Sequence, residues 1–283
     1  MKKNINFGNY LKKIKRRSFV CGLKSTKMSS NEKRFLLKYK PWGIILFSRN
    51  IKNINQTRML TDSIKTLFKD KNYPVLIDEE GGRVSRIRKI FNTSLFSAKF
   101  FGDLYTKNKS EFKVYLYSYV NQISYLLKLM GINMNTVPVL DLLIKNKSNI
   151  IGDRSYSRDP KIVSNIGDTV IELFHKNKII TVMKHIPGHG LAKVDSHKLT
   201  PIVKKNLNYL NKNDFFPFKK KQSYFAMTAH VIYRSIDRLN TATHSKEIIN
   251  LIRKKIGFKN ILISDDLSMK SLKDDLKTNT IKT

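Results

Sequence analysis

Short and nearly continuous apolar runs recur along the chain, with amphipathic stretches between them. The runs cover residues 19–23, 43–47, 74–77, 132–139, 179–183, 225–228 and 261–263. Strands that are covered on both faces do not alternate apolar and polar residues, so these runs predict a buried parallel sheet. Apolar residues at helical spacing predict helices over residues 55–68, 114–130, 162–174 and 245–256. Strands that alternate with helices indicate βαβ units and therefore an α/β fold.

Polar and titratable residues directly follow most of the predicted strands. They include Arg49, Asp78, Glu79, Glu80, Asp141, Lys184, His185, His230, Asp265 and Asp266. The carboxyl ends of strands carry the ligand site both in barrels and in open parallel sheets. The strand number and the lack of a Gly-rich dinucleotide loop favour a (β/α)8 barrel of the TIM type. Only a short polar tail follows Asp266, so we expect the eighth strand to be missing and the barrel to be truncated at its C-terminus.

The chain length and composition predict one domain. The chain has 283 residues, of which 41% are hydrophobic, enough for one large core. We expect residues 1–17 to be a basic extension and residues 18–283 to form a single barrel domain. One cysteine excludes an internal disulfide framework. No apolar segment resembles a signal peptide or a membrane span, which predicts a cytoplasmic protein.

The chain carries a net charge of +34, from 55 Lys and Arg against 21 Asp and Glu, so its surface is strongly basic. Such a surface attracts polyanions. The basic residues are nevertheless spread along the chain, with clusters only in residues 1–17 and 219–221, and no nucleic-acid-binding motif accompanies them. We therefore expect no dedicated nucleic-acid partner. The alternative, a basic nucleic-acid-binding protein, predicts steeply salt-dependent DNA binding.

One loop, residues 184–197, contains three of the six histidines of the chain. Pro187-Gly188 and His189-Gly190 break regular structure. In extended backbone, residues two apart point the same way, so Asp195 can lie beside His197 and raise the pKa of its ring, which suits proton transfer. A metal site is the rival interpretation, because His185 and His189 have the spacing of a helical ligand pair. Helical spacing means little across Pro187-Gly188, so we expect no metal.

Two further segments place carboxylates after predicted strands. Asp265 and Asp266 follow residues 261–263, where one of them can act as a nucleophile and the other can cap a helix. The segment 78–86 combines acids, paired glycines and arginines, and predicts a polar pocket in which a carboxylate binds two sugar hydroxyls. Taken alone, the second segment is also compatible with a solvated turn.

Together these motifs resemble the family 3 glycoside hydrolases, and within them the single-domain bacterial β-N-acetylglucosaminidases of peptidoglycan recycling. The resemblance extends from about Phe19 to Met269 and keeps one order of motifs. The matching segments are residues 43–50, 78–86, 153–156, 184–190, 195–197, 227–230 and 264–269. The Lys-His-x-Pro-Gly-His-Gly loop joined to Asp-Ser-His is the most specific of them.

The resemblance implies a role for each matching residue. Asp265 matches the nucleophile, His197 the acid/base and Asp195 its dyad partner. The residues that match binders of the N-acetylglucosamine unit are Asp78, Arg86, Arg154, Lys184 and His185. The implied reaction is retaining hydrolysis of terminal β-linked N-acetylglucosamine from N-acetylglucosaminyl-1,6-anhydro-N-acetylmuramic acid, with or without a stem peptide, through a covalent glycosyl-enzyme. No cofactor and no metal are implied.

Two departures from the family pattern leave an alternative open. Leu191 stands where the family usually has an acid, and family members continue beyond the nucleophile with a further strand and helices. A truncated barrel exposes a sheet edge, which is covered by the N-terminal extension, covered by a second subunit or left open, and an oligomer is expected only in the second case. The alternative function is an inactive sugar- or muropeptide-binding remnant. A metallohydrolase would differ from both in losing its activity to a chelator.

Overall fold

The computed structural model describes residues 16–144, 151–192, 194, 196, 199–272 and 274–283. The chain divides into two compact units. The first unit contains Met1–Ile77 and Leu126–Met134, and the second contains Asp78–Tyr125 and Asn135–Thr283. The expectation of a single domain over residues 18–283 therefore stays a prediction.

The first unit is built on three parallel strands. They are β1 (Arg17–Gly22), β2 (Pro41–Leu46) and β3 (Val75–Ile77). Val20 is level with Gly43, and Ile45 is level with Leu76. The connecting helices are α2 (Ser30–Tyr39), the 3-10 turn η1 (Ser48–Asn50) and α3 (Ile54–Leu67).

Local sequence explains where these helices begin and which face they bury. Ser29 caps α2, and its side chain accepts from the Glu32 N–H while Glu32 accepts from the Ser29 N–H, a reciprocal capping box. Helix α3 buries Leu60 and Ile64, spaced by one helical turn. Arg16 lies 4.3 Å from the centre of the Tyr73 ring, so the end of the predicted basic extension is part of this unit.

The second unit carries the remaining strands of the larger sheet. Strand β4 (Met134–Asn135) leads into it, followed by β5 (Ile180–Ile186), β7 (Phe225–Thr228) and β9 (Ile261–Ser264). Within each unit the strands are neighbours in chain order, β1-β2-β3 in the first unit and β5-β7-β9 in the second. Chain order with parallel pairing is the topology that a (β/α) barrel requires. A separate small sheet pairs β6 (Ile202–Val203) with β8 (Ile232–Tyr233).

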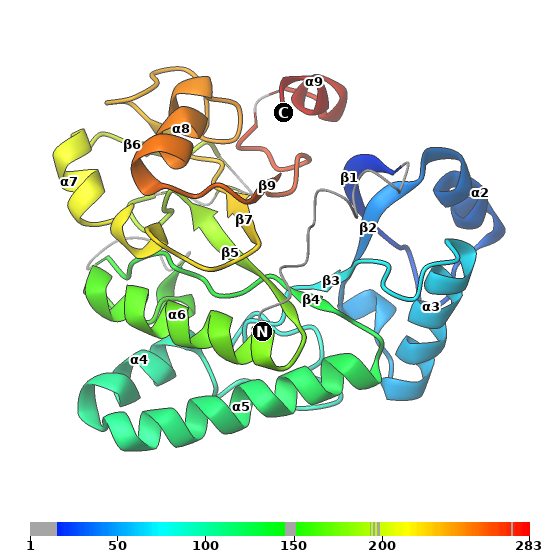
Figure 1. The fold of residues 1–283 in the computed structure, drawn as a ribbon. Coiled ribbons are helices and arrows are strands. Elements are labelled where there is room, and N and C mark those ends of the chain that lie inside the picture. Colours follow the sequence, from blue (N-terminus) through cyan, green and yellow to red (C-terminus); the bar gives the residue numbers. More distant parts are fainter. Residues whose placement is uncertain (1–15, 145–150, 193, 195, 197–198, 273) are drawn as a thin grey trace, which may run out of the picture. The chain divides into compact units, whose positions relative to one another are not determined.

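Helices of the second unit flank its strands (Figure 1). Helix α6 packs against β5 and beside α4. Its buried residues include Val163, Ile166, Val170 and Phe174, which follow helical spacing. The elements are α4 (Ala98–Lys107), α5 (Lys109–Leu129, whose last turn belongs to the first unit), η2 (Gly152–Arg154), α6 (Pro160–Lys176), α7 (Leu207–Lys212), η3 (Phe216–Phe218), α8 (Lys246–Leu251), the π-helical turn η4 (Ile252–Ile256) and α9 (Leu276–Lys282).

The registers of the second unit bring the carboxyl ends of its strands level. Ile186 pairs with Thr228, and Thr228 pairs with Ser264. The register of β5 against β7 shifts between Lys184 and Ile186, which makes His185 the extra residue of a bulge. Bulges re-aim side chains, so both Lys184 and His185 can face the ligand end of the sheet.

The predicted parallel α/β organisation is confirmed, since each predicted strand run overlaps an observed strand of the larger sheet. The sequence patterns missed the β6-β8 pair and the helices α2, α4, α7 and α9. The last of these forms where a polar tail was expected, because Asp275 caps it by accepting from the Thr278 N–H. Among the described residues after β9, none forms an eighth strand of the sheet. No helix in the described part of the chain is sufficiently long and apolar to cross a membrane.

Phe225 tests the packing of the second unit's core. Phe225 on β7 is fully buried, so Phe225→Ala should lower the free energy of unfolding by about 3–5 kcal/mol in urea denaturation. Leu239 is 82% exposed, and Leu239→Ala should change it by less than about 0.5 kcal/mol. Equal effects of the two substitutions would contradict this packing.

Candidate active site

A buried ammonium group is at the centre of the polar cluster at the strand ends of the second unit. Lys184, 3% exposed, comes from β5, and its Nζ lies 2.9 Å from Asp78 Oδ1 and 2.6 Å from Glu80 Oε1. It also donates to Thr136 Oγ1 at 3.0 Å. Burial alone would lower the pKa of Lys184, but the two carboxylates reverse this and raise it. Lys184 is therefore a fixed positive charge.

The two carboxylates that flank Lys184 are held ionised. Burial opposes this, but Lys184, Thr136 and Arg86 together hold the pKa of Asp78 well below its ordinary value. Arg154 binds Glu80 through two parallel contacts, Nε to Oε2 at 2.7 Å and Nη2 to Oε1 at 2.8 Å. Against the cost of burial, Arg154 and Lys184 lower the pKa of Glu80 to about 2.

The side chains of the three successive acids 78–80 point to two different sides of the backbone. Side chains alternate along extended backbone, so Asp78 and Glu80 share one side and meet Lys184. Glu79 is buried on the other side, where it accepts from the Ser85 hydroxyl at 3.0 Å and from the Arg86 N–H at 2.8 Å. Glu79 thus holds the turn that returns Arg86 to the site, where its Nη2 lies 3.3 Å from Asp78 Oδ2.

A second buried carboxylate, Asp141, organises the two histidines next to β5. The segment around Val139 runs parallel to β5, which brings Asp141 beside His185. Asp141 Oδ2 lies 2.6 Å from His185 Nδ1, and Oδ1 accepts the His189 N–H at 2.7 Å. Burial opposes the charge of Asp141, but His185 and His189 lower its pKa. Burial and His185 also lower the pKa of His189 to about 4, so its ring is neutral near pH 7.

The adjacent aspartates after β9 have separate roles. Asp266 Oδ1 accepts from the N–H of Ser268 at 2.8 Å, and so shapes the turn. Asp265, 18% exposed, has Oδ2 3.9 Å from His185 Nε2. Asp266 therefore shapes a turn and does not cap a helix, contrary to the expectation, because no helix begins there. Asp265 directs Oδ2 toward the cluster, and its role as nucleophile stays a prediction.

His230 supports the chain just beyond Asp265. Its Nε2 lies 3.0 Å from the carbonyl oxygen of Asp266 and its Nδ1 lies 2.7 Å from Thr243 Oγ1. A carbonyl only accepts, so Nε2 carries the proton and Thr243 donates to Nδ1. Burial lowers the pKa of His230, consistent with this neutral form. His230 therefore tethers the backbone that presents Asp265.

The structure brings most of the sequence-predicted site residues together in the second unit. Those residues are Asp78, Arg86, Arg154, Lys184, His185 and Asp265. Asp195 and His197 lie outside the described residues. Within the described part of the chain, no group of three or more His, Cys, Asp or Glu side chains is arranged to hold a metal ion.

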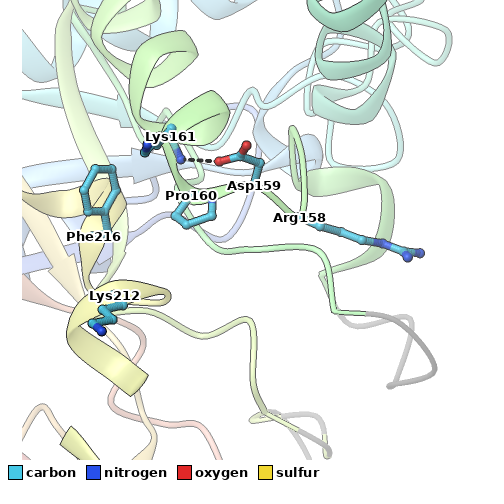
Figure 2. Close-up of a pocket in the computed structure, with 6 residues that line it drawn as sticks. All are labelled: Arg158, Asp159, Pro160, Lys161, Lys212 and Phe216. Carbon is cyan, nitrogen blue, oxygen red and sulfur yellow. Dashed lines mark hydrogen bonds between the residues drawn. The ribbon is translucent and has the colours of Figure 1, made fainter. Parts of the chain in front are cut away.

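A pocket near the start of α6 lies apart from this chemistry (Figure 2). Its lining consists of Arg158, Asp159, Pro160, Lys161, Lys212 and Phe216, none of which is a residue of the cluster. Asp159 caps α6 by accepting from the Lys161 N–H at 2.7 Å, which accounts for the acid in this pocket. The candidate site is the charged cluster rather than this pocket.

The sequence patterns assign no role to Glu80, Thr136 or Asp141, although the structure places all three in the cluster. Glu80 follows from strand alternation, because it stands two residues after Asp78. Asp141 had been noted as a strand-end acid, but its pairing with His185 depends on which strands are neighbours. Thr136 carries no signal in the sequence, since a threonine near a strand end usually only packs or caps.

The chain is similar to a known protein family and to several characterised relatives. The family described as the glycosyl hydrolase family 3 N terminal domain matches residues 11–281. A beta-hexosaminidase of Nitrosomonas eutropha is 34% identical over 241 residues, which are 82% of this chain and 67% of that protein. Beta-hexosaminidase A of Pseudoalteromonas piscicida is 28% identical, over 95% of this chain but only 48% of its own length. The chain thus spans about half to two thirds of these relatives.

Solved structures show the same fold. Native NagZ from Neisseria gonorrhoeae superposes with a TM-score of 0.85 at 30% identity, over 94% of this chain and 78% of that one. The same protein in complex with N-trifluoroacetyl-D-glucosamine gives a TM-score of 0.85. With the parallel strands in chain order, these scores confirm the predicted α/β barrel-type fold.

The charged cluster predicts a pH-dependent cost for removing its central cation. Lys184→Met leaves Asp78 and Glu80 buried without their ammonium partner and should lower the free energy of unfolding by about 3–5 kcal/mol at pH 7. Both carboxyls have lowered pKa values, so the stability that they contribute is present above about pH 4 and is lost as the pH falls further. The difference between the wild type and the variant in urea denaturation should therefore shrink from pH 7 to pH 3. A constant difference would contradict the ionised cluster.

Proposed function

Because the chain belongs to glycosyl hydrolase family 3, we propose that it is a retaining β-N-acetylglucosaminidase with Asp265 as its nucleophile. The chain is a glycosidase of the β-hexosaminidase type, the name that its curated relatives carry. One observation carries the assignment to this site. A partly exposed carboxylate, Asp265, lies 3.9 Å from a histidine that is itself fixed beside a rigid cluster of charges.

The cluster suits the recognition of sugar hydroxyls. Asp78 is 18% exposed and is held ionised, so it can accept two hydroxyl hydrogens while Lys184 and Arg86 keep it in place. Glu80 and Arg154 are paired with each other, and they support the charged cluster behind Asp78. A binding carboxylate that cannot swing or take up a proton presents a preorganised acceptor.

The environment of Asp265 suits a nucleophile. Its Oδ1 accepts from the Asp266 N–H at 2.8 Å, which leaves Oδ2 directed toward His185. The carboxylate stands at the tip of a strand, on a rigid part of the scaffold. In the proposed reaction it attacks the anomeric carbon through an oxocarbenium-like transition state and forms a glycosyl-enzyme.

We assign the acid/base role to His197, with Asp195 as its partner, on the Asp-Ser-His motif alone. His197 protonates the departing oxygen and then accepts a proton from the attacking water. Two displacements at one carbon retain the β-configuration. No metal and no cofactor enter these steps.

The proposed substrate is a peptidoglycan fragment. It is N-acetylglucosamine linked to 1,6-anhydro-N-acetylmuramic acid, with or without a stem peptide, and the proposed compartment is the cytoplasm. Support for the amino-sugar half comes from the family and from the N-trifluoroacetyl-D-glucosamine complex of the gonococcal relative. The aglycone rests on the motif resemblance.

Turnover of 4-nitrophenyl N-acetyl-β-D-glucosaminide tests the proposal. The wild type should release nitrophenol, and Asp265→Ala should lower kcat/KM by about 10⁴-fold or more because the covalent intermediate cannot form. His197→Gln should cost about 10²–10⁴-fold. The first sugar product, observed by NMR, should be the β-anomer.

Asp62→Ala is the matched control, because its carboxyl is half exposed on α3 in the first unit. This variant should keep wild-type turnover. If folded wild type binds N-acetylglucosamine without hydrolysing the nitrophenyl glycoside, the chain is a sugar-binding protein and not an enzyme. If Asp265→Ala retains full activity, the nucleophile lies elsewhere.

A further inference from the structure

The second unit contains a buried carboxyl that the proposed mechanism does not use. Asp214 follows α7 and is only 1% exposed. Neither of its carboxyl oxygens makes a hydrogen bond with any residue that the structure describes. A buried carboxylate without a partner is costly, so a fold that keeps one at this position calls for an explanation.

Asp214 lies against the loop that follows β5. Gly188 has φ +144°, and a Cβ at this glycine would lie 2.7 Å from the Asp214 carbonyl oxygen and 2.9 Å from its Cβ. The Leu191 N–H faces the Asp214 carboxyl, although not in hydrogen-bonding geometry. The residue therefore packs on both ends of the segment 188–191.

Tyr233 on β8 ties the same loop from a second direction. Its hydroxyl donates to the carbonyl of Gly188, and its ring meets that of Phe215 with centroids 5.4 Å apart. Phe215 is the neighbour of Asp214 in the chain, so Asp214, Phe215 and Tyr233 pack together against the segment 188–191. On the loop itself, His189 is anchored to Asp141 through its N–H at 2.7 Å.

We propose that Asp214 is a positioning residue that holds the loop 187–192 as a neutral carboxylic acid, and that its ionisation releases the loop. The charged and titratable groups that face it are Asp141 and Tyr233, both acids, and no described cation pairs with it. Ionised Asp214 would be a second buried anion beside Asp141. Movement of the loop would relieve that repulsion by admitting water.

The protonation chemistry agrees with this geometry. Burial, and next the charge of Asp141, raise the pKa of Asp214 to about 7 against the partial opposition of two backbone N–H groups. A carboxyl with a raised pKa in the folded state lowers stability as the pH rises from about 4 to about 7. Above that window Asp214 is charged and unpaired, and it no longer holds the loop.

The consequence for activity rests on the proposed function, because Leu191 lies only four residues before Asp195 in the chain. The proposed acid/base step therefore depends on the segment that Asp214 holds. The expected effect is a fall in kcat, with KM little changed, as the pH rises past about 7.

Asp214→Asn tests the inference, because the amide copies the shape of the neutral acid and cannot ionise. Thermal unfolding should give equal Tm values for the variant and the wild type near pH 4, and a variant Tm higher by at least about 3 °C at pH 8.5. Limited proteolysis at pH 8.5 should cleave the loop more slowly in the variant. The alkaline limit of kcat should move up by about one pH unit, with no change at pH 6.

Asp103→Asn, which alters an exposed carboxyl on α4 of the same unit, is the control and should follow the wild type in all three measurements. Asp214→Leu provides a second neutral side chain if the asparagine variant does not fold. A variant Tm that does not rise relative to wild type between pH 4 and 8.5 would overturn the inference. Absence of turnover in every variant would count against the proposed function, while the Tm and proteolysis differences would still decide the role of Asp214.

Discussion

The candidate site depends on one buried ion cluster, the ammonium of Lys184 between the carboxylates of Asp78 and Glu80. A fully buried ammonium is tolerated only when anions surround it. These anions lie about a hundred residues before Lys184 in the chain, so the cluster forms only when the second unit is folded. Arg154 completes the neutralisation through its paired contacts with Glu80. The cluster therefore ties the ligand face of the second unit to its sheet.

Around this cluster, burial separates supporting groups from groups that can meet a ligand. Glu79 and Asp141 are buried, and their oxygens bind backbone N–H groups and His185. Asp78 and Asp265 keep part of their surface exposed at the edge of the site. The buried charges are fixed, and the exposed oxygens are accessible to a ligand. This arrangement suits the recognition of a polyhydroxyl ligand in one orientation.

The overall basic charge and the local acidity of the site are compatible because they act over different distances. Exposed lysines are screened by salt within about 10 Å, so they affect the whole surface but contribute little to one buried carboxyl. Asp214 shows the local effect, since burial and the neighbouring Asp141 decide its protonation although the chain carries a net charge of +34. Desolvation and near neighbours, rather than net charge, set the chemistry of this unit.

The sequence by itself indicated the runs that form the strands, their parallel direction and the position of Asp78, Lys184, His185 and Asp265 at or near the carboxyl ends of strands. Hydrophobic runs and helical spacing are local patterns, so a single chain of letters contains them. Only the tertiary structure decided that Asp141 pairs with His185, that Thr136 meets Asp78 and that Asp214 lies beneath Gly188. Those contacts join residues far apart in the chain, and they depend on strand registers and on a bulge at His185 that no local pattern specifies.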